Sequence, residues 1–154
     1  MSIEKIVAKQ YRDKVNQAVN QFDSLPMLPK EGWIRTVRKA LGMSGTQLAK
    51  RLGVTKARVS KAEQDEPTGS VTLKSMQAMA EAMDCKFVYA VVPNQNVEEV
   101  IRLRAIDKAR IQVKAASTHM ALEAQSLNKE QLNFEIERIA AQIMDKMPAD
   151  LWND

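Results

Sequence analysis

The sequence predicts a mainly α-helical protein with one short strand. The 154 residues include only five Gly and five Pro, too few for an all-β fold built on tight turns. Apolar residues recur at spacings of three and four along most of the chain, which is the period of an amphipathic helix. Several of these stretches also begin at a capping residue or end at Gly, as helices do.

The chain contains one Cys and one His, and this scarcity excludes several kinds of site. One Cys cannot form an intrachain disulfide, and a structural zinc ion takes about four Cys or His ligands. No run of about 20 apolar residues could span a membrane, and the first residues lack the apolar core of an export signal. We therefore expect a cytoplasmic protein with no metal, no cofactor and no catalytic site.

Residues 1–29 are expected to form an N-terminal amphipathic helix and a linker. Over residues 2–22 the apolar positions make one stripe, and Ser2 can cap the helix. Two Pro and one Gly between residues 24 and 32 interrupt this pattern, so a linker is expected there.

Residues 30–93 are expected to hold four short helices and then the strand. The helices are predicted at 33–41, 44–52, 56–64 and 72–84. In the first of these, Trp33 and Leu41 belong to the apolar side. Ser44 and Gln47 have the spacing of a capping box, in which each side chain bonds the backbone amide of the other residue.

Basic residues are concentrated in one part of the chain. Residues 30–62 hold nine Lys or Arg and a single acidic residue, Glu31. A basic block of this density within a folding segment suggests a polyanionic partner. A solvated surface rich in Lys and Arg is the alternative, and charge alone does not decide between them.

A short run of β-branched and aromatic residues is typical of a strand. It consists of Phe87, Val88, Tyr89, Ala90, Val91 and Val92, and Pro93 ends it. A lone strand leaves its amides and carbonyls unpaired. We favour pairing with the same strand of a second copy, because a two-fold dimer is the commonest oligomer. Pairing with an extended stretch of the same chain is the alternative.

Residues 44–64 have the form of a helix, a tight turn and a second helix. Gly53 and Val54 make the turn, and Thr55 can cap the second helix. In the helix-turn-helix arrangement the first helix crosses the phosphate backbone of DNA and the second enters the major groove. A helical hairpin that only packs is the alternative, but the charge, the caps and the spacing all agree with the DNA-binding form.

The residues of this motif carry a resemblance to a known family. The run from Thr46 to Thr55, followed by Val59, Ser60 and Glu63, resembles the phage-repressor-like helix-turn-helix family of the Xre/Cro class. The resemblance covers roughly residues 33–84. It implies a lambda-repressor-like helix-turn-helix bundle and a regulator that binds double-stranded DNA.

The resemblance also implies roles for individual residues. The residues on the base-reading side of the recognition helix are Lys56, Ala57, Arg58, Ser60 and Lys61. Arg58 could fork onto a guanine, and Ala57 could touch a thymine methyl group. The candidates for phosphate contact are Arg35, Arg38, Lys39, Ser44, Gly45, Thr46, Lys50 and Thr55. Three of these, residues 44–46, are at a helix start, where phosphate binds well.

A narrower resemblance covers most of the chain. The chain is similar to the mobile mystery protein A family at five places: Gly32 to Arg35, Ala40 to Met43, Val88 to Pro93, His119 to Glu123 and the terminal Leu151-Trp152. Members of that family are helix-turn-helix proteins encoded beside a Fic-domain protein. The similarity therefore implies a regulator that is also a candidate antitoxin of a Fic-type toxin–antitoxin pair.

Residues 94–154 are expected to form a C-terminal helical region for dimerisation or partner binding, with helices at 96–117 and 128–147. Residues 117–127 are ambiguous and could continue the first helix. His119 and Glu123, four residues apart, are interpreted as a partner contact, although an acid–base pair or the start of a metal site has the same spacing. Ser126 and Glu130 match the form of the inhibitory helix of Fic antitoxins, but Gln131 departs from that pattern.

Two compatible functions follow from the sequence. The first is a homodimeric, sequence-specific transcriptional repressor that regulates its own operon. The second is a protein that mainly binds and restrains a Fic-domain partner, with DNA binding secondary. No constellation of residues in the sequence supports a third reading, that of an enzyme.

Overall fold

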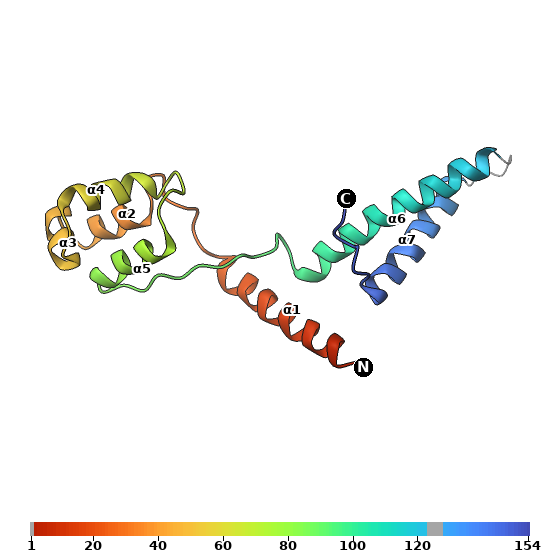
Figure 1. Ribbon diagram of the computed structural model, residues 1–154, viewed down its shortest axis with the longest axis horizontal. Coiled ribbons are helices and arrows are strands. Elements are labelled where there is room, and N and C mark those ends of the chain that lie inside the picture. Colours follow the sequence, from red (N-terminus) through yellow and green to blue (C-terminus); the bar gives the residue numbers. More distant parts are fainter. Residues whose placement is uncertain (1, 123–127) are drawn as a thin grey trace. The chain divides into compact units, whose positions relative to one another are not determined.

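The computed structural model describes residues 2–122 and 128–154 of the chain. Within these residues lie seven helices: α1 (Ile3–Phe22), α2 (Trp33–Ala40), α3 (Gly45–Leu52), α4 (Lys56–Asp65), α5 (Leu73–Ala82), α6 (Val97–Leu122) and α7 (Lys129–Lys146). The mainly helical fold predicted from the sequence is confirmed (Figure 1). None of the helices described has both the length and the apolar character that crossing a bilayer requires.

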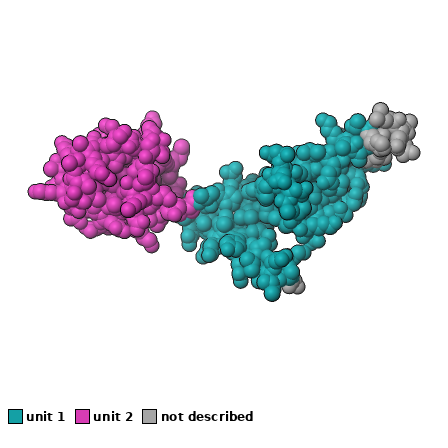
Figure 2. All heavy atoms as spheres, in the orientation of Figure 1, with its two compact units in different colours: residues 1–23, 91–154 teal, residues 24–90 magenta. Residues whose placement is uncertain are grey.

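The chain divides into two compact units, which Figure 2 shows in different colours. Unit 1 combines residues 1–23 with residues 91–154 and contains α1, α6 and α7. Unit 2 consists of residues 24–90 and contains α2 to α5. The N-terminal helix thus belongs with the C-terminal helices, although unit 2 separates them in the sequence.

Unit 2 has a single core to which each of its four helices contributes. The buried side chains are Ile34, Leu48, Ala49, Val59, Met76, Met79 and Met83. Trp33 and Leu41, which the sequence places on the apolar side of α2, remain exposed. The side of α2 that faces this core is centred on Ile34, and Val37 packs against the same core.

Local capping positions the helices of unit 2 much as the sequence predicts. The Ser44 hydroxyl accepts a hydrogen bond from the Gln47 amide at 3.1 Å, and the Gln47 side chain accepts one from the Ser44 amide at 2.8 Å. Gly53 ends α3 with a left-handed φ of 71°, which lets the chain reverse into α4. Thr55 and Thr72 cap α4 and α5.

The start of α2 depends on a residue distant in the sequence. Gly32 occupies the N-cap position and offers no side-chain acceptor. Glu66, directly after α4, accepts hydrogen bonds from the amides of Trp33 at 2.6 Å and Ile34 at 2.8 Å. Gly32 has φ of +84°, and a Cβ on it would lie 2.8 Å from the Glu66 carboxyl carbon. Only glycine therefore fits between this carboxylate and the helix.

The strand predicted at residues 87–92 is not formed within the chain. This segment has no regular secondary structure and follows an extended path (Figure 1). Phe87 packs against the core of unit 2, and its ring stacks on Tyr89 with centroids 5.6 Å apart. A strand requires a hydrogen-bonding neighbour, and no strand is present elsewhere in residues 2–122 and 128–154 to supply one. Pairing within the chain is thus not observed, and pairing between copies stays a prediction.

In unit 1, α6 and α7 form an antiparallel hairpin (Figure 1). Its core consists of Ala105, Ile106, Ala109, Ala140, Ile143 and Leu151. Leu151 comes from the tail that follows α7. The Arg104 Nε donates to the Leu151 carbonyl at 2.7 Å, and its guanidinium lies 5.9 Å from the Trp152 ring centroid. These contacts tie the tail to α6. Beyond residue 117, α6 continues to Leu122, as one of the two sequence alternatives allowed.

Replacing Gly32 by Ala should lower the free energy of unfolding of unit 2 by about 2–4 kcal/mol. The substitution places Ala in a strained conformation and displaces a carboxylate that accepts two hydrogen bonds. The measurement is urea unfolding followed by tryptophan fluorescence in a Trp152→Phe background. Because the chain has two Trp, Trp33 then reports on unit 2 alone.

Gly69→Ala is the matched control for this prediction. Gly69 also has a positive φ, of +78°, but a Cβ there would meet open space. Gly69→Ala should lower the free energy of unfolding by only about 1 kcal/mol, which is the cost of the backbone strain alone. Equal losses for the two variants would show that the contact with Glu66 does not matter.

Candidate nucleic-acid interface

α3 and α4 form a rigid pair joined by only three residues, Gly53, Val54 and the capping Thr55. Leu48 and Ala49 of α3 and Val59 of α4 are all buried in the core of unit 2. The turn, Gly53-Val54, leaves no slack between the helices, and α5 packs against α3 from the same core. The angle between α3 and α4 is therefore fixed by packing rather than by a flexible loop.

The outer face of α4 carries the predicted base-reading residues. All five of them are exposed, namely Lys56, Ala57, Arg58, Ser60 and Lys61. By the helical period, Ala57 and Lys61 lie opposite the buried Val59, and Lys56 and Arg58 lie on either side of them. Lys61 makes an ion pair with Asp65 at 2.9 Å. Among the residues described, Lys56 and Arg58 have no ion pair, so their charges face solvent.

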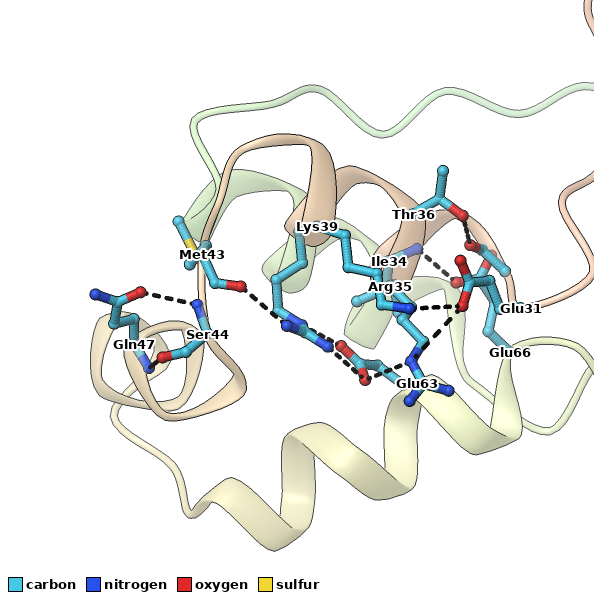
Figure 3. Close-up of polar contacts among 12 residues, drawn as sticks. Glu31, Ile34, Arg35, Thr36, Lys39, Met43, Ser44, Gln47, Glu63 and Glu66 are labelled. Carbon is cyan, nitrogen blue, oxygen red and sulfur yellow. Dashed lines mark hydrogen bonds and ion pairs between the residues drawn. The ribbon is translucent and has the colours of Figure 1, made fainter.

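The inner face of α4 is acidic and binds α2 (Figure 3). Glu63 accepts a hydrogen bond of 2.5 Å from the Arg38 Nε, and the Arg38 Nη1 donates to the Met43 carbonyl at 2.9 Å. The side chains of Arg38 and Glu63 are only 13% and 9% exposed. The hydrogen bond to Glu63, with the charge of this carboxylate, raises the pKa of the Arg38 guanidinium. Arg38, a predicted phosphate contact, is thus occupied inside unit 2.

The two other predicted phosphate contacts of α2 are more accessible. The Arg35 Nε lies 3.8 Å from a Glu31 carboxylate oxygen and 3.9 Å from one of Glu63. The Lys39 Nζ lies 3.2 Å from Glu31. About half of each basic side chain is exposed. Exposed ion pairs of this kind are weak, so both cations can exchange Glu31 for another anion.

The start of α3 presents backbone donors. The Ser44 amide is occupied by the Gln47 side chain in the capping box. The amides of Gly45 and Thr46 are in the first turn of α3, where no intrahelical acceptor exists for them. Lys50 is exposed further along the same helix. Thr55 is exposed at the start of α4, and its hydroxyl accepts from the Arg58 amide at 3.2 Å.

Of the predicted partner contacts, the structure describes Glu130 and the backbone of His119 in α6. Glu130 is exposed in the first turn of α7, beside Phe134. Glu123 and Ser126 fall outside the residues described, as does the side chain of His119. Where the structure describes side chains, no group of three His, Cys, Asp or Glu is placed to hold a metal ion.

Sequence reasoning missed the roles of Glu63 and Glu66. The sequence motif includes Glu63 without indicating its partner, and it does not include Glu66. One signal was available, because Gly32 at a predicted helix start leaves amides that need an acceptor from elsewhere. The two acids also follow directly after the basic block of residues 30–62, with the helical spacing of three that places both on one face.

Two helices locked at a fixed angle, with the outer face of the second basic and exposed, define a helix-turn-helix unit. Residues 34–89 match the model of a family described as helix-turn-helix, a family of DNA-binding regulators. The chain therefore contains an Xre/lambda-repressor-like helix-turn-helix domain at residues 34–89. No curated protein and no solved structure shows a significant match to the chain.

Arg38→Ala should lower the free energy of unfolding of unit 2 by about 2 kcal/mol, because it leaves the buried Glu63 carboxylate without its main partner. Arg58→Ala should change it by less than about 0.5 kcal/mol, since Arg58 is exposed. Urea unfolding followed by Trp33 fluorescence measures both. If Arg38→Ala is as harmless as Arg58→Ala, the Arg38–Glu63 pair does not hold α2 on α4.

Proposed function

We propose that this chain is a sequence-specific transcriptional repressor that binds DNA as a homodimer and regulates its own operon. The observation that carries the proposal is the division of α4 into two faces. Its inner face is bonded to α2 through Glu63, and Glu66, which directly follows α4, caps α2. Its outer face exposes Lys56, Arg58 and Lys61 to a partner.

In the proposed complex, α4 lies in the major groove and α3 crosses the backbone. Arg58 donates two hydrogen bonds to a guanine edge, and Ala57 contacts a thymine methyl group. Ser60 and Lys61 read neighbouring bases, while Lys56 reads a base or holds a phosphate. The small side chain of Ala57 lets the helix approach the bases closely.

Phosphate contacts are proposed on both sides of this helix. The amides of Gly45 and Thr46 and the hydroxyl groups of Ser44 and Thr55 lie at helix starts, where anions are favoured. Lys50 of α3 and Arg35 and Lys39 of α2 add charge. Arg38 is left out of this set, because its guanidinium is bonded to Glu63 and to the Met43 carbonyl.

The homodimer would place two copies of α4 in successive major grooves, about 34 Å apart. Residues 87–92 are a candidate for part of the dimer contact. Val88, Tyr89 and Val91 are exposed, and the segment has no ladder partner among the described residues. Antiparallel pairing with the same segment of a second copy would satisfy its backbone groups.

A second candidate function is the restraint of a Fic-domain partner, which the similarity to the mobile mystery protein A family implies. One observation favours it: Phe134 is exposed on α7 beside Glu130, in a unit separate from the helix-turn-helix domain. An exposed aromatic side chain is a common anchor in protein interfaces. The two functions use different units, so one chain can perform both.

Arg58→Ala should weaken binding to the DNA upstream of the protein's own gene by roughly 10- to 100-fold, the value of one bidentate base contact. The measurement is a titration with scrambled competitor DNA at two salt concentrations. Lys50→Ala should weaken specific and competitor binding alike and reduce the salt dependence by about one phosphate contact.

Lys74→Ala is the control for the loss of one exposed charge, because Lys74 is exposed on α5 outside the α3–α4 pair. It should leave binding unchanged. If Arg58→Ala also leaves a discrete complex unchanged, the placement of α4 in the groove is wrong. If only competitor-sensitive binding appears, the basic surface does not recognise a DNA sequence. Restraint of a protein partner then becomes the better-supported function.

A further inference from the structure

α1 is held in unit 1 by its polar side. The Lys5 Nζ lies 3.6 Å from Asp145 of α7, and the Arg12 Nε lies 3.8 Å from Glu98 of α6. Asn16 donates to Glu98 at 2.7 Å and accepts from the Val97 amide at 2.8 Å. Residues 5, 12 and 16 are separated by seven and four positions, so they share one side of the helix.

The apolar side of α1 is uncovered in its N-terminal half, whereas Val15, Ala18, Val19 and Phe22 of its C-terminal half are half-buried. Its N-terminal half carries Ile3, Ile6, Val7 and Tyr11, which recur at helical spacing and lie on the other side of the helix from Lys5 and Arg12. Ile3 is 80% exposed and Tyr11 is 68% exposed. No residue of α1 is buried in the structure. An amphipathic helix normally has its whole apolar side covered and its polar side in water.

The uncovered N-terminal half of the apolar side is therefore available to a partner. A helix of 20 residues gains most of its stability from packing an apolar face, and polar contacts at the surface are weak substitutes. The four exposed side chains make an apolar patch of about 400 Å², the size at which surface patches mark interaction sites. We refer to residues 3, 6, 7 and 11 as the α1 stripe.

We propose that the α1 stripe is covered by the α1 stripe of a second copy, so that two α1 helices pack across a two-fold axis. In a two-fold interface both copies use the same patch. The stripe of each copy is therefore covered by the stripe of the other. Two patches of this size, with their flanking atoms, bury about 1,000 Å² in total, which reaches the lower limit of specific interfaces.

A lipid surface is a poorer occupant of the stripe. Helices that lie on membranes keep Lys and Arg free on the polar side to contact anionic headgroups. In α1, Lys5 and Arg12 face carboxylates of α7 and α6, and Lys9 is paired with Asp13 at 2.7 Å. Lys5 and Arg12 point toward α7 and α6, on the side of α1 away from the stripe, so they would not lie among headgroups that face the stripe. A second protein surface is therefore the better cover.

The α1 contact rests on the proposed function in that it gives the proposed homodimer a specific interface. It involves unit 1 alone. It can fail while DNA binding by α4 holds, and DNA binding can fail while it holds. It also differs from the proposed pairing of residues 87–92, because it is apolar and side-chain based, whereas strand pairing uses backbone groups. Substitutions in α1 therefore address this contact separately.

The test is sedimentation of the full chain, without DNA, across a range of concentrations. The unmodified chain should form dimers. Val7→Glu combined with Tyr11→Glu should raise the dissociation constant of the dimer at least about 100-fold, because four carboxylates would be buried against each other. Both positions are on the outer side of α1, so far-ultraviolet circular dichroism should show unchanged helix content.

Phe134→Glu is the control, since Phe134 is an apolar residue of unit 1 that is as exposed as Tyr11 but lies on a different helix. It should leave the dissociation constant unchanged. A chain that stays monomeric throughout the concentration range overturns the proposal and assigns the stripe to another occupant. A double variant that dimerises as tightly as the unmodified chain overturns it as well, whatever its affinity for DNA.

Discussion

Two carboxylates at the end of α4 hold the helix-turn-helix domain in its form. Glu66 caps the first turn of α2 by accepting from the Trp33 and Ile34 amides, and Glu63 binds the Arg38 guanidinium. Buried carboxylates are costly unless their hydrogen bonds are satisfied. Here the donors lie on a single helix, so the positions of α2 and α4 are specified together. The apolar core supplies the driving force for packing, and these two acids fix how α2 sits on it.

This constraint explains why the faces of α4 differ in chemistry. Its inward residues are Val59, Glu63 and Glu66, and each has a partner in unit 2. Its outward residues are mainly basic and exposed. Because they are exposed, they do not stabilise the fold. A positive face of this kind adds little to folding, and its charges repel one another. The polyanionic ligand of the proposed function would give this face a role. The same distinction separates Arg38, which belongs to the scaffold, from Arg58, which is free to bind.

Local features of the fold could be predicted from the sequence because they depend on neighbouring residues. Ser44 with Gln47, Thr55 and Gly53 each act within a few positions, and their caps and turn are present. The capping of α2 by Glu66 joins residues more than thirty positions apart. The local pattern at Gly32 shows only that the amides after it need an acceptor, and it does not show which residue supplies one. The exposure of Trp33 and the inward position of Arg38 follow from that packing, so they were missed for the same reason. The segment at 87–92 has strand-like residues, but a strand also needs a partner, which sequence pattern alone cannot provide.

The central claim is that α4 presents its outer face to DNA while its inner face stays bound to α2. The most direct measurement is the change in backbone amide NMR shifts when the labelled chain is titrated with duplex DNA from upstream of its gene, with a scrambled duplex in parallel. The account predicts the largest changes at residues 44–46 and 55–61, and small changes at Glu63, Glu66 and the α6–α7 hairpin. Changes centred on α5 or on unit 1, with residues 55–61 unaffected, would contradict it.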